Sequence, residues 1–283
     1  MATVVIVGAG GKMGTRAAEK VGKESRYNVV LCETNVERAR ALAREGFTVT
    51  DLNAALPEAD FVLLAVPDAL IGQIAHQVVP RMKKDSTLIM LDAAAAYVNQ
   101  LPDPGSRTFM IAHPCHPPFF TDQPTPEARR DYFGGTAEQD IVIALAAGSE
   151  SKFEEGSDLC AAIFAPVREV YRVTPEQFAL LEPAMSEIVV AAAASLMRAS
   201  LDAAVEKGVP REAAYAFMAG HARIALAIVF GAEKSPFSDA AKIAIRWGMR
   251  EIIREDWKKV FDRGPLVEAI SEMLQTKFEV DPA

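Results

Sequence analysis

The sequence contains few cysteines, with only Cys32, Cys115 and Cys160 among 283 residues. An odd and scattered set of cysteines excludes a disulfide framework and is typical of a reducing compartment, which predicts a cytoplasmic protein. No two of them are separated by two residues, and this argues against a structural zinc site.

Basic residues are outnumbered by acidic ones. The chain has 30 Lys and Arg against 38 Asp and Glu, a formal net charge of −8, and no stripe of basic residues. Because phosphate binding needs clustered Lys and Arg, this composition argues against nucleic acid as a partner.

Targeting signals are also missing from the sequence. The N-terminus has no basic segment and no small-residue cleavage site, so we expect no signal peptide. The most apolar long stretch, residues 184–201, is alanine-rich and carries Glu187 and Arg198. We interpret it as a buried helix and expect no membrane partner.

The first part of the chain alternates between two kinds of segment. Short apolar runs rich in β-branched residues predict buried strands, and longer segments between them have a helical pattern. This alternation indicates an α/β fold with a doubly wound parallel sheet, a Rossmann domain that we assign to residues 1–173. The predicted strands are residues 3–7, 28–32, 61–66, 87–91, 109–112 and 140–146, and the predicted helices are residues 12–23, 36–44 and 70–82.

The pattern changes at Thr174, which is followed by Pro175 and Gln177. Thr at the cap, Pro at the first helical position and Gln at the third form a strong helix start. Only helical patterns follow, so we predict an all-helical substrate and dimerisation domain over residues 174–283. The predicted helices are residues 176–206, 211–230, 238–254 and 265–277.

A glycine-rich turn, GAGGKMG, follows the first predicted strand. Its spacing is G-x-x-G-x-x-G, and glycines let backbone N–H groups approach a pyrophosphate at a helix N-terminus. We expect the cofactor to contact this turn, namely Gly8, Gly11, Lys12, Met13 and Gly14.

An acid, Glu33, ends the second predicted strand. A carboxylate there binds the ribose hydroxyls and repels a 2′-phosphate, which predicts NAD rather than NADP. The alternative is an ordinary strand–helix turn with an unrelated Glu. Asp68, which follows the strand at residues 61–66, could contact the nicotinamide ribose or simply cap a helix.

The segment HPCHPP, residues 113–118, follows another predicted strand. Three prolines stiffen it, and His113 and His116 could bind a divalent metal. The alternative is a loop held together by imidazole hydrogen bonds. Cys115 is a doubtful nucleophile because the sequence indicates no partner for it.

Two more candidates lie on predicted helices. Glu182 precedes Pro183, which should kink its helix, and a carboxylate in this apolar segment needs a partner such as a metal ion or a Lys unless it faces solvent. His221 lies in an apolar helix, where it is either a ligand or a core histidine.

Taken together, the chain resembles the 6-phosphogluconate dehydrogenase and β-hydroxyacid dehydrogenase superfamily. The motifs that carry the resemblance are VIVGAGGKMG, AVPD, LDAAAAY, AHPCHPPFF, RRDYFGG, LLEPAMSE, AGH and PFSDA. The sequence departs from the classical members because LLEPAMSE has Glu182 and Ser186 where those enzymes carry a catalytic Lys and an Asn.

The resemblance implies an NAD-dependent enzyme that oxidises and rearranges a small sugar acid with the help of a divalent ion (Zn, Mg, Ca or Mn). It implies His113 and Glu182 as metal ligands. Either His116 or His221 could serve as general base, since an imidazole titrates near neutrality. It also implies a homodimer formed through the helical domain, with His221 a candidate from the second subunit. Two alternatives are a simple dehydrogenase of 2- or 3-hydroxy acids and a non-catalytic NAD-binding regulator.

Overall fold

The computed structural model describes residues 1–275, so the predicted end of the last helix at residue 277 lies outside the described residues. The chain forms two compact units. Unit 1 comprises Met1–Glu182 together with the described residues from Val267 onward, and unit 2 comprises Pro183–Leu266. The predicted division after residue 173 into domains of different function remains a prediction.

Unit 1 is built on a sheet that has seven strands within the described residues, in the order β2-β1-β3-β4-β5-β6-β7. Strands β1 to β5 are parallel, β6 is antiparallel to β5, and β7 is parallel to β6. The strands are β1 (Ala2–Val7), β2 (Tyr27–Cys32), β3 (Phe61–Leu64), β4 (Thr87–Met90), β5 (Thr108–Pro114), β6 (Gln139–Ala147) and β7 (Val167–Val173).

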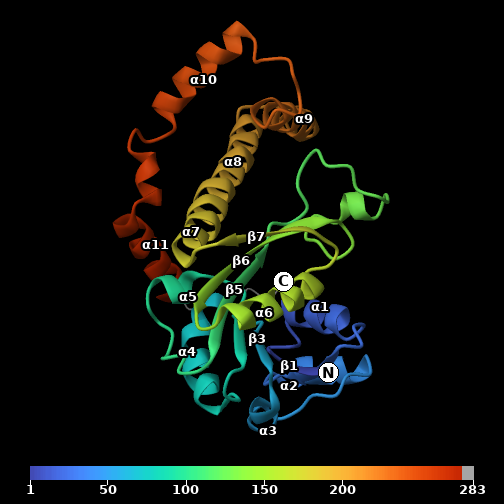
Figure 1. Cartoon of the computed structure of the whole chain (residues 1–283). Helices are drawn as coiled ribbons and strands as arrows, with labels where there is room; N and C mark the ends of the chain where they lie inside the picture. The colour runs from blue at the N-terminus through green and yellow to red at the C-terminus, as the bar shows by residue number, and fades with distance from the viewer. Residues whose placement is uncertain (276–283) are drawn as a thin grey trace. The chain divides into compact units, whose positions relative to one another are not determined.

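Helices cover both faces of this sheet (Figure 1). On β1, Val4 and Ile6 join the core beneath α1 and α6, whereas Val5 and Val7 join the core beneath α3, α4, α5 and α7. This alternation follows from the two-residue period of a strand. The helices are α1 (Lys12–Val21), α2 (Val36–Arg44), α3 (Leu52–Ala55), α4 (Asp68–Val78), α5 (Ala94–Tyr97), α6 (Glu150–Ile163) and α7 (Pro175–Ala179), with 3-10 turns η1 (Leu56–Glu58), η2 (Val79–Arg81) and η3 (Ala128–Arg130).

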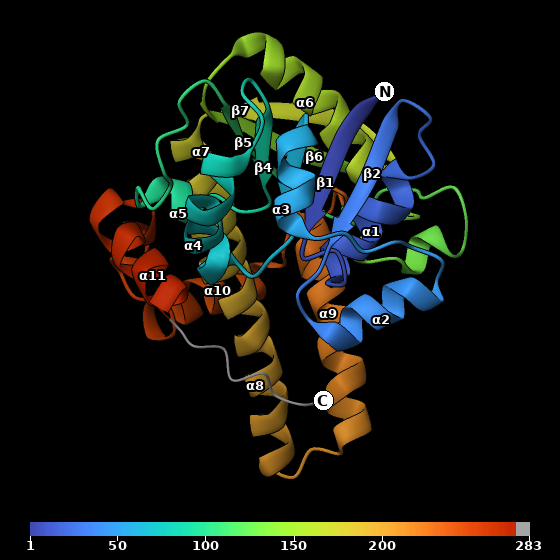
Figure 2. The same ribbon diagram turned by 90° about the horizontal axis from the view of Figure 1, so that it is seen from below.

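The predicted doubly wound fold is confirmed, with one difference in strand direction. A parallel neighbour requires a crossover connection, usually through a helix. Among residues 115–138, which join β5 to β6, the structure contains only the short turn η3, and β6 therefore runs back beside β5. The helix α6 then returns the chain to β7, which is parallel to β6 (Figure 2 shows the strands from below).

Besides the short helices α3 and α5, two longer elements of unit 1 were not predicted. The helix α6 combines charged residues with Gly156, and its buried side chains become recognisable only from packing. Strand β7 lies at the sheet edge, and its five central residues are exposed, so it lacks the apolar run of a buried strand.

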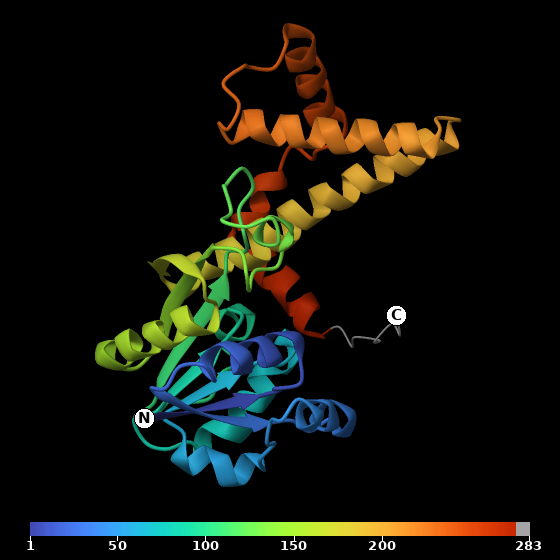
Figure 3. The ribbon, with the colours of Figure 1, turned by 90° about the vertical axis from the view of Figure 1, so that its right-hand side faces the viewer.

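Unit 2 is helical, as predicted for this part of the chain. The helices α8 and α9 are antiparallel neighbours joined by a short turn (Figure 3). The elements are the π-helical segment η4 (Leu180–Ala191), α8 (Ala192–Glu206), α9 (Arg211–Val229), α10 (Asp239–Glu251), the turn η5 (Trp257–Phe261) and α11 (Arg263–Gln275), of which η4 and α11 cross the unit boundaries.

The prediction that residues 184–201 form a buried helix is wrong for the single chain. The segment is helical, but Met185, Val190 and Leu196 are exposed. The continuous helix Pro175–Glu206 is long and apolar enough to cross a membrane by length and composition alone, a weak criterion that core helices also meet. Within the described residues, the helix α8 packs against α9.

Candidate functional site

The glycine-rich turn between β1 and α1 requires its glycines for steric reasons. Gly8 has φ +78°, and a Cβ there would lie 2.5 Å from the carbonyl oxygen of Ala65. A Cβ on Gly14 would lie 2.3 Å from the carbonyl oxygen of Gly8, so α1 can approach the turn only with glycine at this position. The N–H of Gly11 donates to the same Gly8 oxygen at 3.1 Å, which closes the turn.

Glu33 is tied to this turn by its carboxylate. One oxygen accepts the N–H of Gly10 at 2.9 Å, and the other accepts the N–H of Asn35 at 2.8 Å. A carboxylate has about four acceptor positions, so capacity remains for ligand hydroxyls. Gly10 was not among the predicted site residues, although a Cβ there would lie 2.5 Å from the Cβ of Arg38.

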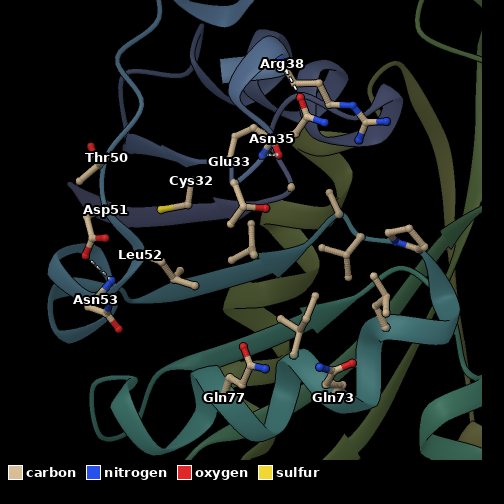
Figure 4. A pocket seen from close by; sticks show the side chains of 18 of the residues that line it. Cys32, Glu33, Asn35, Arg38, Thr50, Asp51, Leu52, Asn53, Gln73 and Gln77 are labelled. Atoms are coloured by element: carbon tan, nitrogen blue, oxygen red, sulfur yellow. Dashed lines mark hydrogen bonds between the residues drawn. The ribbon is translucent and has the colours of Figure 1, made fainter. Parts of the chain in front are cut away.

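A cavity of about 680 Å³ opens beside Glu33 at the carboxyl ends of β1, β2 and β3. In Figure 4, Gln73 and Gln77 extend from α4 on the side opposite Glu33 and Asn35. The polar side chains of its lining suit an adenosine, whose ribose and base present hydroxyl and amino groups. The charged and polar residues that line it are Glu33, Thr34, Asn35, Arg38, Thr50, Asp51, Asn53, Gln73, Gln77 and Arg81.

His113 and Glu182 lie together in unit 1. His113 is near the end of β5, and its Nδ1 is 3.5 Å from Oε2 of Glu182 and 2.9 Å from the carbonyl oxygen of Pro114. Burial lowers the pKa of His113, so the imidazole is neutral at pH 7 and the pair is not a full salt bridge. The predicted proximity of these two candidates therefore occurs in the folded chain.

Two further carboxylates, Asp68 and Asp92, interact electrostatically with this pair. Burial, together with the charges of Asp92 and Glu182, raises the pKa of Asp68 to about 7. Burial and Asp92 raise the pKa of Glu182 to about 7. Mutual repulsion among neighbouring carboxylates of this kind is relieved by protonation or by a cation.

Asp92 was not predicted as a site residue. It follows β4, is 5% exposed, and accepts the N–H of Ala94 at 2.6 Å. Burial raises its pKa, although hydrogen bonds and the nearby His113 oppose this effect. A polar residue directly after the apolar run of residues 87–91 was the available signal, since parallel strands end at one edge of the sheet.

His116 lies next to His113, with 5.8 Å between the ring centroids. Its Nδ1 is 3.0 Å from the carbonyl oxygen of Phe133, and its ring is tilted against the Phe133 ring. The ammonium of Lys12 lies 3.1 Å from the centroid of that Phe133 ring. The glycine turn and the histidine segment are therefore linked through Phe133.

The thiol of Cys115 is unreactive despite its position beside the histidines. Burial, with contributions from Asp140 and Glu182, raises the pKa of its thiol to about 11. A thiol with such a pKa is protonated at neutral pH and is a poor nucleophile.

The last two predicted residues differ in their placement. Met13 packs against the core under β1 in unit 1. His221 belongs to α9 in unit 2, where its ring stacks on Phe217 at 3.9 Å and its Nδ1 is 2.9 Å from the Phe217 carbonyl oxygen. It lines an apolar cavity of about 480 Å³ between α8 and α9.

The potential metal ligands number two at this site. No group of three or more His, Cys, Asp or Glu side chains arranged for a metal occurs among residues 1–275. His113 and Glu182 alone would leave most coordination positions to a substrate and water, as an open catalytic site requires.

Two family models match the chain. Residues 1–153 match the NADPH-binding domain of acetohydroxy acid isomeroreductase, and residues 121–274 match the C-terminal region of decarboxylating phosphogluconate dehydrogenase. The fold and the site thus define an oxidoreductase of the hydroxyacid dehydrogenase-like superfamily, which confirms the resemblance seen in the motifs.

Comparison with characterised proteins narrows this class. The chain is 44% identical over 269 residues to the D-apionate oxidoisomerase of Cupriavidus necator, covering 94% of this chain and 97% of the relative. It is 39% identical to the D-apionate oxidoisomerase of Rhizobium rhizogenes, covering 96% of this chain and 100% of the relative. The chain belongs to the D-apionate oxidoisomerase family.

Solved structures agree with this assignment. A semialdehyde dehydrogenase NAD-binding protein from Cupriavidus necator, crystallised with calcium and NAD, matches with a TM-score of 0.93 and 42% identity over 96% of this chain and 99% of that one. An NADH-preferring ketol-acid reductoisomerase from an uncultured archaeon matches with a TM-score of 0.66 at 20% identity, over 96% of this chain and 82% of that one, and shares the fold.

Proposed function

We propose that this protein is an NAD-dependent oxidoreductase that converts D-apionate and NAD to 3-oxoisoapionate and NADH. The observation that carries the proposal is the partly buried His113–Glu182 pair, 3.5 Å apart at the carboxyl edge of a Rossmann sheet, in a chain that aligns over nearly its whole length with D-apionate oxidoisomerases.

The residues of the glycine turn fit a dinucleotide. At Gly8 and Gly14 any side chain would fill the space that the backbone needs, and Gly11 completes the turn. Backbone N–H groups there, with Lys12 and Met13, would hold the pyrophosphate. Glu33 would bind the adenosine ribose, and Asp68 would contact the nicotinamide ribose. When bound, NAD supplies the two-electron acceptor for the oxidation.

A divalent cation also fits the site. His113 is neutral and Glu182 faces it. The neighbouring carboxylates of Asp68 and Asp92 repel Glu182, and a bound cation would relieve this repulsion. His113 and Glu182 would hold the ion, and substrate and water would complete its shell. Calcium accompanies NAD in the Cupriavidus necator structure, which supports calcium among the candidates Zn, Mg, Ca and Mn. When bound, the ion polarises neighbouring oxygens of the substrate.

The chemistry separates into an oxidation and a skeletal shift. Oxidation at C2 of the 2-hydroxy acid removes a hydride and the hydroxyl proton, and we assign that proton to His116, which lies beside His113. In the second step the C3 hydroxyl loses its proton, a hydroxymethyl carbon moves with its bonding electrons from C3 to C2, and C3 becomes the ketone. The C2 oxygen then takes up the proton that His116 holds, and the C3 hydroxyl proton is released to water, so His116 would serve as base and then as acid.

The helical unit suggests a homodimer. Its exposed apolar side chains include Val190, Tyr215, Phe217, Phe230 and Trp247, far more than an isolated unit needs to leave in water. We propose that a second copy covers them and that His221 acts from the partner subunit. A monomer in sedimentation equilibrium at micromolar concentration would contradict this proposal.

A cytoplasmic location completes the proposal. All three cysteines, Cys32, Cys115 and Cys160, are free thiols, which suits a reducing compartment. The expected partners are a small sugar acid and a second copy of the chain.

The test is a screen of sugar acids for NADH absorbance, followed by NMR of the product. D-apionate should yield NADH and the rearranged 3-oxo acid, whereas an unrearranged 2-oxo acid would indicate a simple dehydrogenase. Tight NAD binding with no NADH from any sugar acid would indicate a regulator. If His113→Ala and Glu182→Ala both keep full activity in a chelator, the metal proposal fails.

A further inference from the structure

The connection between β5 and β6 is organised by one carboxylate, that of Asp131. One of its oxygens accepts the N–H groups of Phe133 at 3.2 Å and Gly134 at 2.9 Å. The other accepts those of Thr136 at 2.8 Å and Ala137 at 3.1 Å. Partial burial acts in the opposite direction, yet these bonds lower the pKa of Asp131, so the carboxylate is ionised at neutral pH. We call residues 131–137, closed by these four bonds, the amide clamp.

The amide clamp turns two carbonyl oxygens toward the rest of unit 1. The oxygen of Phe133 accepts from Arg16 at 3.2 Å and lies 3.0 Å from Nδ1 of His116, and the oxygen of Gly135 accepts from Lys20 at 2.6 Å. Arg16 and Lys20 both belong to α1, the helix that follows the glycine turn. The clamp is therefore joined both to α1 and to the histidine segment.

This geometry determines the tautomer of His116. A carbonyl oxygen can only accept, so Nδ1 must carry the proton, and the lone pair of the neutral ring is left on Nε2. The backbone of His116 has φ +61°, a left-handed conformation that costs free energy in a non-glycine residue and persists only where surrounding contacts hold it. His116 therefore depends on the loop around it for both its position and its protonation pattern.

We propose that Asp131 is a positioning residue for His116: by closing the amide clamp it holds the Phe133 carbonyl that keeps Nδ1 protonated and Nε2 free to act as a base. Asp131 touches neither substrate nor cofactor in this role. The inference rests on the proposed function only for the use to which Nε2 is put, and not for the tautomer itself.

The test uses the NAD-saturated protein labelled with ¹⁵N-histidine, which contains four histidines. Long-range ¹H–¹⁵N correlation, assigned with single His→Gln variants, should show His116 as the Nδ1–H tautomer in the natural protein. In Asp131→Asn an NH₂ donor would face two amide donors, so His116 should move to the Nε2–H form or to a mixture. Asp122→Asn, in the same connection but outside the amide clamp, should leave all four histidines unchanged.

Kinetics provides a second readout on D-apionate. We expect Asp131→Asn to lower kcat at least tenfold with the KM for NAD within twofold of the natural value. The double variant Asp131→Asn/His116→Gln should be no slower than His116→Gln alone, because both changes disable one base. Fully multiplicative losses would overturn the proposal.

The tautomer of His116 in the natural protein tests the proposal even if the Asp131→Asn variant does not fold. An Nε2–H tautomer of His116 in the natural protein, or an unchanged Nδ1–H signal in a folded Asp131→Asn protein, would overturn the proposal. If D-apionate yields no NADH, the proposed function fails while the tautomer result stands, so the two failures are distinguishable.

Discussion

Glu182 should reduce the stability of the folded chain at alkaline pH, and Glu182→Gln should restore it. The side chain is 18% exposed, and its pKa rises from 4.5 to about 7 through burial and the charge of Asp92. A rise of that size corresponds to roughly 3 kcal/mol at about 1.4 kcal/mol per pKa unit. Because the folded state holds the proton more tightly, its stability falls as the pH rises from 4.5, and the loss is complete above about 7.

Calorimetry at two pH values measures this effect. At pH 8, in a chelator, Glu182→Gln should raise the Tm by about 5–10 °C, which is the shift that roughly 3 kcal/mol produces in a chain of this length. At pH 4.5 the two proteins should differ little, since the natural carboxyl is then largely protonated in the folded state. The exposed Glu169→Gln on β7 is the control and should not shift the Tm by more than about 1 °C at either pH.

Addition of a divalent ion tests the role of the Glu182 carboxylate in a second way. At pH 8 calcium should stabilise the natural protein but not Glu182→Gln, because the carboxylate that would hold the ion has been replaced. If Glu182→Gln is no more stable than the natural protein at pH 8, the burial of an ionisable Glu182 is refuted.

Four further predictions concern Glu33, two glycines and the thiol of Cys115. Glu33→Ala should raise the KM for NAD about tenfold or more and reduce the preference for NAD over NADP, measured by initial rates with both cofactors, and an unchanged ratio would contradict the role of this acid. Gly14→Ala should cost about 1–3 kcal/mol of unfolding free energy and abolish NAD binding, because its Cβ would lie 2.3 Å from the oxygen of Gly8. In contrast, Gly220→Ala, with no atom within 4 Å of the added Cβ, should gain up to about 1 kcal/mol in denaturant unfolding. Cys115→Ser should keep kcat within about threefold, since the thiol has a pKa of about 11, and a loss of activity would restore the cysteine as a nucleophile.

The fold of the nucleotide-binding half could be predicted from local sequence patterns. A buried parallel strand needs an apolar run, and a turn with φ +78° at Gly8 and a helix packed against it at Gly14 needs glycine. These requirements involve residues that are close in the chain. The same reasoning missed β7, because an exposed edge strand has no such run.

The sequence indicated which residues of the site are reactive, but it did not indicate how they are arranged in space. His113 and Glu182 stood out because proline-rich and proline-interrupted segments carried polar groups in apolar surroundings. Asp92 had only its place after an apolar strand to mark it, and that place does not show that the carboxylate is buried. Asp131 was missed because nothing in its neighbouring residues marks a carboxylate as the acceptor of four amides.

Local periodicity and glycine spacing were thus enough to predict the Rossmann fold, the cofactor turn and the helical second half. They could not supply the electrostatics of the site. The pKa values of Asp68 and Glu182 near 7 arise from desolvation and from charges contributed by separate elements of the sheet and the helix. Such effects depend on distances through space, and those are set when β4, β5 and the helix at Glu182 pack together in unit 1.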